Sequence, residues 1–302
     1  SSPISCGVAA VILASADAAR ELGLGLRATI ESTAVAGTDY ERMGLGPIPA
    51  VRAVLEQAVT DAGAAEVEID DGGAEEIARR AGRHIEVAAV AVRDTEKARK
   101  LVGDGVLITQ DGMEVVRHPD IDIVVELIGG ETVARDWIRE AIAQGKHVVT
   151  ANKSLLAKHG NEIFAAAHEK GVMVTFEAAV AGGIPIVKAI REGLTANRIQ
   201  WVAGIINGTT NFILSEMRSR GLPFDTVLAE AQRLGYAEAD PTFDIEGVDA
   251  AHKLTLLASL AFGIPVQFDK AHIEGISGLA QEDIAHAERL GYRIKLLGIT
   301  RR

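Results

Sequence analysis

The chain lacks a second cysteine, so its single thiol, Cys6, cannot form an internal disulfide. It also lacks the CxxC and HExxH spacings that hold zinc, and its eight histidines are scattered singly. This sparing use of cysteine is typical of proteins in a reducing compartment. We therefore expect a cytoplasmic protein without structural zinc.

Positive charge is also scarce. Thirty-one lysines and arginines stand against forty-two aspartates and glutamates, which gives a formal net charge of −11. Such a balance repels nucleic acid and anionic lipid, so we expect neither as a partner. The longest apolar runs, residues 8–14 and 87–92 among them, are far shorter than the roughly 20 residues that span a bilayer, which excludes a transmembrane helix.

An alternation of apolar runs and amphipathic stretches begins at residue 85. It predicts four strands and two intervening helices, which are, in chain order, strand 85–92, strand 121–128, helix 132–144, strand 147–150, helix 154–170 and strand 172–176. Nearly all-apolar strands are typical of a parallel sheet covered on both faces. We therefore expect an α/β fold with a doubly wound, Rossmann-like nucleotide-binding domain.

The glycine-rich turn of such a domain is missing from its expected place. A dinucleotide-binding domain begins with a strand that runs into G-x-G-x-x-G and a helix. Gly23-x-Gly25 instead follows a helix and precedes a strand, and Gly44-x-Gly46 continues into prolines that have no N–H for a phosphate. The domain is therefore expected to lack its usual first βα unit, unless an N-terminal strand such as residues 8–14 takes the central position.

Polar residues follow each predicted strand, at the edge where ligands of such sheets bind. Arg93, Gly129 and Glu177 come directly after the first, second and fourth strands, and Lys153 follows the third strand by three residues. A lysine in a loop is usually a solvated charge, and a lysine at a strand tip can instead face a ligand. The sequence leaves both readings open for Lys153.

The second half of the chain concentrates carboxylates near one lysine. Asp249 and Lys253 are four residues apart and share a helix face, which alone predicts an exposed ion pair. Because Glu238 and Asp244 precede this pair, the cluster also suits a substrate with its own ammonium group, such as an amino acid. The segment 207–211, NGTTN, either presents N–H groups to an anion or simply caps a helix.

Four segments resemble homoserine dehydrogenase. They read VTANK at 149–153, FEAAVAGGIP at 176–185, GIINGTTN at 204–211 and DPTFDIEGVDAAHK at 240–253. The resemblance covers about residues 74–302. It implies NAD(P)-dependent interconversion of L-homoserine and L-aspartate 4-semialdehyde, on the route to threonine and methionine.

The resemblance also implies roles for individual residues. Lys253 would donate the proton when the aldehyde is reduced, and Lys153 would reach both substrate and nicotinamide. Asp249, Glu238 and Asp244 would bind the substrate. The implied cofactor contacts are Lys153, Gly235, Arg93 and Gly129, and the implied sodium ligands are Glu177, Val180, Gly182 and Ile184. Because Arg93 follows the first predicted strand, we favour NADP over NAD.

The domain organisation follows from these comparisons of motifs. Residues 1–60 contain a stretch, about 5–58, that resembles thiolase, although no thiolase nucleophile or histidine motif is present. Residues 61–74 form a junction, 75–183 a partial NAD(P)-binding domain, and 184–302 an α+β substrate and dimerisation domain that we expect to be truncated at its C-terminus. A homodimer is expected.

Two other functions stay open at this point. The chain can be an inactive remnant that binds an amino acid or sodium, because the glycine-rich loop is missing. A thiolase-type acyltransferase is the third reading.

Overall fold

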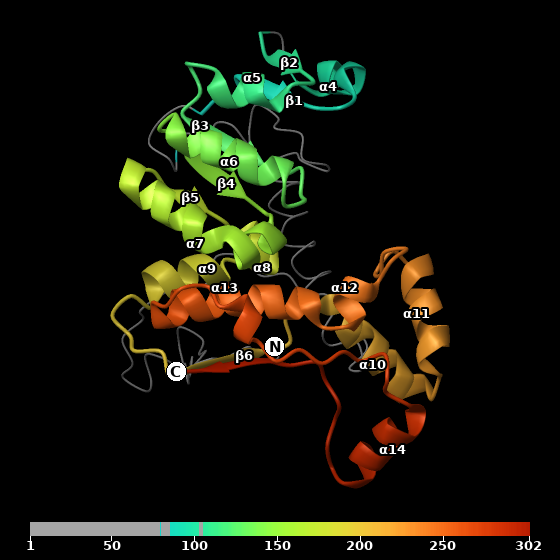
Figure 1. Cartoon of the computed structure of the whole chain (residues 1–302). Helices are drawn as coiled ribbons and strands as arrows, with labels where there is room; N and C mark the ends of the chain where they lie inside the picture. The colour runs from blue at the N-terminus through green and yellow to red at the C-terminus, as the bar shows by residue number, and fades with distance from the viewer. Residues whose placement is uncertain (1–78, 80–84, 103–104) are drawn as a thin grey trace, which may run out of the picture. The chain divides into compact units, whose positions relative to one another are not determined.

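The computed structural model describes residue 79, residues 85–102 and residues 105–302 (Figure 1). The chain divides into one unit of residues 1–77 and a second of residues 78–302. The thiolase-like segment, the predicted strand 8–14, the junction at 61–74 and the two glycine pairs before it therefore lie outside the described residues. None of the described helices has the length and apolar composition needed to cross a membrane.

The first part of the described chain alternates parallel strands with helices, as the α/β prediction requires. Its strands form two groups: β1 pairs with β2, and β4 lies between β3 and β5. The strands are β1 (Ala89–Ala91), β2 (Leu107–Thr109), β3 (Ile123–Glu126), β4 (His147–Thr150) and β5 (Val174–Thr175). The helices are α4 (Thr95–Leu101), α5 (Gly112–Arg117), α6 (Val133–Ala143) and α7 (Lys153–Lys170).

Where the strands differ in length from the sequence prediction, they are shorter than predicted. β4 has the predicted bounds, but the apolar run at 85–92 yields only the three residues of β1, and the run at 172–176 yields only β5. β1 is short because its paired register with β2 covers only Ala89–Ala91, and β2 itself was not predicted from the sequence. Hydrophobicity predicted where strands occur, whereas hydrogen-bonding partners set how long they are.

Helices α6 and α7 supply much of the core beside β3, β4 and β5. Their inward residues recur every three or four positions, which aligns them on one face. The fully buried members are Ala134, Ile138, Ala141, Ile142, Leu155, Leu156 and Ile163. At α5 a Cβ on Gly112 would lie 2.2 Å from the Trp137 ring of α6, so the close approach of these two helices requires glycine.

The second part is mainly helical and contains one antiparallel pair of strands, β6 (Trp201–Gly204) with β7 (Gly298–Arg301). Its apolar helix α13 packs against α7 and against β7. The remaining elements are α8 (Ala178–Ala181), α9 (Ile186–Lys188), a π-turn (Ala189–Gly193), α10 (Gly208–Arg220), α11 (Phe224–Arg233), α12 (Thr242–Ile245), α13 (Val248–Phe262), a 3₁₀ turn (Phe268–Lys270) and α14 (Gln281–Arg289).

Candidate active site

Two lysines from distant segments meet at one carboxylate. Lys153 is the first residue of α7, and its Nζ lies 3.2 Å from Oδ1 of Asp249. Lys253, one turn after Asp249 on α13, places its Nζ 2.7 Å from Oδ2 of the same side chain. The Lys253 ammonium also donates to the carbonyl of Ile206 at 3.1 Å. The structure thus brings together two amines that are a hundred positions apart in sequence.

Asp249 is almost inaccessible, with 3% of the residue exposed, so the reading of this pair as an exposed surface ion pair is wrong. Asp249 lies in the first turn of α13, where the helix dipole stabilises negative charge. The Lys153 side chain remains 34% exposed and that of Lys253 18% exposed. Both amines therefore stay within reach of a ligand while their shared counter-ion does not.

Asn207 connects this centre to a second carboxylate. Its side-chain amide donates to Asp249 at 2.9 Å and to Asp244 at 2.7 Å. Its oxygen accepts the N–H of Thr210 at 2.8 Å, which caps α10, so the helix-cap reading of the NGTTN segment is confirmed. Thr209 then donates to Asp244 at 3.2 Å and to the Tyr236 carbonyl at 2.7 Å.

The groups around Asp249 keep its carboxylate ionised. Burial by itself raises the pKa of Asp249, but the charge of Lys253, the hydrogen bonds from Lys253 and Asn207, and the charge of Lys153 outweigh it. The pKa of Asp249 therefore lies below its ordinary value. A carboxylate that stays ionised keeps two ammonium groups close together, and such a pair can stabilise negative charge on a substrate oxygen and supply a proton to it.

The remaining predicted binding residues lie on loops and turns. Glu238 is exposed, and within the described residues its carboxylate has no ion pair. Gly235 follows α11 with φ +76°, a left-handed conformation that favours glycine. Gly129 has φ +70° in the turn after β3. Arg93 is exposed directly after β1, and its carbonyl accepts a hydrogen bond from Gln110 at 3.1 Å.

The predicted sodium ligands lie on one short segment around α8. The two carboxylate oxygens of Glu177 accept the backbone N–H groups of Val187 and Lys188, each at 2.8 Å, and so fix the start of α9. Val180 is buried within α8, Gly182 ends that helix with φ +59°, and Ile184 is half exposed. Among the described residues, no group of three or more histidine, cysteine or acidic side chains is arranged to hold a metal ion. A cation here would depend on backbone carbonyls.

The sequence analysis missed several polar residues that organise the site. Asn207 was considered only as part of a segment that caps a helix or presents N–H groups to an anion, whereas its bridge between Asp244 and Asp249 links positions far apart in sequence. Glu126, at the tip of β3, was read as part of a plain apolar strand. A glutamate inside the run IDIVVELI is the signal that was available, because a buried carboxylate needs donors.

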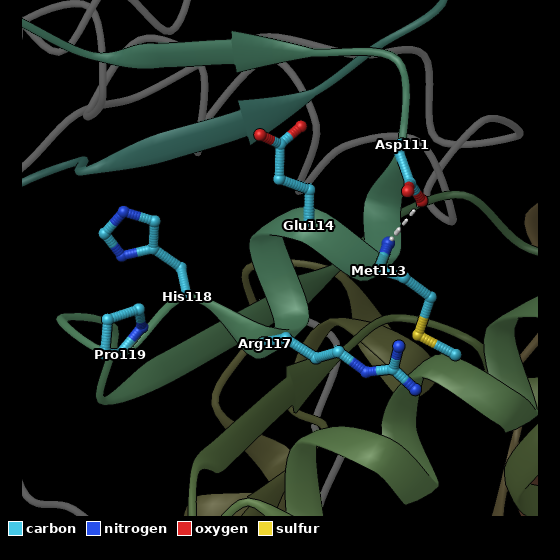
Figure 2. A pocket seen from close by; sticks show the side chains of 6 residues that line it. All are labelled: Asp111, Met113, Glu114, Arg117, His118 and Pro119. Carbon is cyan, nitrogen blue, oxygen red and sulfur yellow. Dashed lines mark hydrogen bonds between the residues drawn. The ribbon is translucent and has the colours of Figure 1, made fainter.

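A surface pocket of about 370 Å³ lies elsewhere, along α5 (Figure 2). Two of its charged residues are already engaged: Asp111 accepts the N–H of Met113 at 2.9 Å, and Arg117 donates to Glu140 at 2.8 Å. The other lining residues are Glu114, His118 and Pro119. The pocket contains neither candidate lysine, so concavity does not identify the site here; convergence of charged groups does.

Comparisons with known proteins match both parts of the described chain. The family model "Homoserine dehydrogenase, NAD binding domain" matches residues 68–177, and the model "Homoserine dehydrogenase" matches residues 185–301. A homoserine dehydrogenase of Pseudomonas aeruginosa is 70% identical over 195 residues, which are 65% of this chain and 45% of that protein. The chain spans about half the length of the curated relatives it matches.

Solved structures agree with these matches. A homoserine dehydrogenase from Thiobacillus denitrificans is 65% identical with a TM-score of 0.73, over 83% of this chain and 55% of that one. A candidate homoserine dehydrogenase from Archaeoglobus fulgidus is 33% identical with a TM-score of 0.63, over 76% of this chain and 77% of that one. These likenesses confirm the predicted fold class, a Rossmann-like NAD-binding part followed by a second, catalytic-type part. With both family models matched in order, the chain belongs to the homoserine dehydrogenase family.

Proposed function

We propose that this chain carries the NAD(P)-dependent interconversion of L-homoserine and L-aspartate 4-semialdehyde. The observation that carries the proposal is the meeting of Lys153 and Lys253 at the buried carboxylate of Asp249. The family models that match residues 68–177 and 185–301 support it. When bound, the nicotinamide dinucleotide supplies or accepts the hydride.

Each residue of the centre has a task that follows from its geometry. Reduction of the aldehyde leaves negative charge on oxygen, and the Lys253 ammonium stabilises that charge and gives its proton to the same oxygen. Lys153, the more exposed of the two amines, holds the substrate from the side of β4. Both oxygens of Asp249 already accept from the lysines and Asn207, which favours a role in holding these amines. Glu238 and Asp244 remain for the substrate ammonium.

The finer cofactor assignments are also part of the proposal. Gly129, Gly235 and Arg93 contact the dinucleotide, and Arg93 favours the 2′-phosphate of NADP. Sodium binds at the segment from Glu177 to Ile184, through oxygen ligands of the kind that hard cations prefer. Turnover measured in sodium and in choline buffers of equal ionic strength tests this site, and equal rates in both would remove it.

Homoserine-dependent reduction of NADP⁺ tests the function directly. The chain should turn over, and Lys253→Ala or Lys153→Ala should lower kcat by about 10²–10⁴-fold, the range for loss of a general acid. Lys170→Ala, at the exposed end of α7, is the matched control and should retain full activity. Binding of homoserine without any turnover in the unaltered chain would instead favour the inactive binding remnant.

We also propose a homodimer formed through the outer face of β6 and β7. The register pairs Trp201 with Arg301 and Ala203 with Ile299, so these side chains share a face. Trp201 and Ile299 are 51% and 54% exposed, and Ile205 and Leu297 extend the same face. An apolar sheet face of this kind is typical of an interface between copies.

Sedimentation of the chain tests the dimer. The unaltered chain should sediment as a dimer, and Ile299→Glu should shift it to a monomer, because the new carboxylate would be buried without a partner. Leu290→Glu, at a 74% exposed position after α14, is the control and should leave the mass unchanged. A monomer for the unaltered chain would contradict the proposal.

A further inference from the structure

Glu126, the last residue of β3, is a buried carboxylate bound only by neutral donors among the described residues. It is 4% exposed. One oxygen accepts the backbone N–H groups of Ile128 and Gly129 at 2.9 and 3.0 Å, and the other accepts the Thr150 hydroxyl at 2.6 Å. Three donors satisfy a group whose burial would otherwise be costly, so they fix its position closely.

Thr150 carries the network from β3 to the next strand. It is the last residue of β4 and lies directly opposite Glu126 in the parallel register. Its hydroxyl oxygen also accepts the N–H of Asn152 at 3.0 Å. Because Thr150 is 1% exposed, no solvent can replace either bond without local opening.

Asn152 closes the network and leads to the lysine. Its side-chain NH₂ donates to the Gly130 carbonyl at 2.6 Å, and its side-chain oxygen accepts the N–H of Leu155 at 3.1 Å, which caps α7. The next residue is Lys153, whose amine reaches Asp249. The turn after β3 and the first turn of α7 are therefore held by the same three side chains.

This network links the turn at Gly129–Gly130 with the Lys153 amine, two features that the reaction needs at a fixed separation. Gly129 and Gly130 have φ +70° and +75°, so the turn is a left-handed one, and Glu126 binds the amide of its first glycine. The turn lies at the carboxyl ends of parallel strands, the edge where such sheets bind ligands. Lys153 follows the adjacent strand, β4, and lies at the same edge of the sheet.

We propose that Glu126 is a positioning residue which, through Thr150 and Asn152, sets the dinucleotide-facing turn at Gly129–Gly130 and the Lys153 amine as one unit. The inference rests on the proposed function only in naming the dinucleotide as the ligand of that turn. Glu126 makes no step of the reaction itself. It acts by keeping the turn and the amine in register, so disturbing one end of the network should be felt at the other.

A matched pair of variants tests this coupling without requiring turnover. Thr150→Val keeps the shape of the side chain and removes the hydroxyl, whereas Thr150→Ser keeps the hydroxyl. Amide hydrogen exchange at Ile128, Gly129 and Asn152 should become about tenfold faster in Thr150→Val, as expected for loss of one buried hydrogen bond, and should stay close to the unaltered rate in Thr150→Ser. Thermal melting of each variant shows that the fold is retained.

The second readout is the reactivity of Lys153. Pulse labelling with acetic anhydride, followed by mass spectrometry, should label Lys153 faster in Thr150→Val than in Thr150→Ser, while exposed Lys170 labels equally in both. A purely local structural role of Thr150 would not move this rate. In a chain that turns over, kcat should fall in Thr150→Val and be rescued in Thr150→Ser.

Each outcome decides the proposal. Unchanged exchange at Gly129 in Thr150→Val overturns the network, and faster exchange with unchanged labelling of Lys153 overturns its coupling to the lysine. If Thr150→Val does not fold, Glu126→Gln takes its place with the same two readouts and should accelerate both, because its NH₂ group cannot accept the Thr150 hydroxyl and its oxygen accepts more weakly than a carboxylate. If the chain fails to reduce NADP⁺, the proposed function is refuted. Hydrogen exchange and lysine labelling then still test the network.

Discussion

Glu126 at the tip of β3 and Asp249 at the start of α13 are buried to nearly the same extent, with 4% and 3% exposure, but their surroundings differ. Two backbone amides and a hydroxyl surround Glu126, whereas two ammonium groups and one amide surround Asp249. The first set of donors cannot change protonation near neutral pH and holds backbone in place. The second set contains groups that can exchange protons with a substrate. The comparison separates a region that shapes the site from a region that performs its chemistry.

The largest effect should come from breaking the ionic region. Asp249→Asn leaves Lys153 and Lys253 beside a neutral group, so the free energy of unfolding at pH 7 should fall by about 3–5 kcal/mol, the range for losing one partner of a buried pair. Urea unfolding measures this. The pKa of Asp249 is lowered in the folded state from an ordinary value of 3.8, so its contribution is fully present above that pH and is lost as pH falls through the lower folded value.

The matched control for this change is Asp269→Asn, on the exposed 3₁₀ turn, which should leave the urea midpoint nearly unchanged. The stability of Asp249→Asn and of the unaltered chain should converge in strong acid. Equal stability of the two at pH 7 would mean that Asp249 does not hold the lysines together.

A second, smaller effect on the free energy of unfolding should appear when the pH is lowered, because a histidine is buried beside Asp249. His252 is fully buried on α13, with ring centroids 5.1 Å from Phe243 and 4.3 Å from Phe268. Within the described residues neither ring nitrogen has a hydrogen-bond partner. Burial, and then the charge of Lys158, lower the pKa of His252 from 6.5 to about 4. The unfolded chain therefore binds the proton more readily than the folded chain between these two values.

Stability from this histidine should be lost as pH falls from 6.5 towards 4, by up to about 3 kcal/mol. His252→Phe should abolish that part of the acid dependence, because phenylalanine cannot be protonated. Urea midpoints at pH 7 and pH 4.5 measure the difference, with His272→Phe, at a 91% exposed side chain, as the control. An identical acid dependence in His252→Phe and the unaltered chain would refute the buried, neutral state of His252.

The smallest of the three effects should come from the neutral region. Glu126→Gln keeps an oxygen for the amides of Ile128 and Gly129, removes the charge and places an NH₂ group where an oxygen accepts the Thr150 hydroxyl, so unfolding should become easier by about 1–2 kcal/mol. Glu96→Gln, at a 76% exposed side chain, serves as the reference and should change little. A loss as large as that of Asp249→Asn would erase the distinction between the two regions.

Sequence patterns predicted α6, α7 and β4 well, because those elements carry their own periodicity. The bounds of β4 were predicted in full, and α6 and α7 were predicted to within one residue at each end. β2 was missed, since a three-residue strand offers too few positions for any period to be read. β6 ends at Gly204, where its pairing with β7 ends.

The site could be predicted only in part, and the missing part is three-dimensional. Lys153 and Lys253 were named through motifs that resemble a family, since no local pattern joins residues a hundred positions apart. The spacing of Asp249 and Lys253 predicted their contact but not their burial, which depends on α7 and α12 packing against α13. Asn207 and Glu126 escaped notice because a cap and an apolar strand already gave each of them a sufficient local explanation.

The chain's two tryptophans occupy contrasting settings: Trp137 lies against Gly112 between α5 and α6, and Trp201 stands half exposed on β6. Intrinsic fluorescence therefore has one sheltered emitter and one open to dissolved quenchers. In a monomer such as Ile299→Glu, a quencher such as acrylamide should extinguish the emission of Trp201 first, and in the proposed dimer the second copy should protect it. The fluorescence of Trp201 thus reports whether that face is covered.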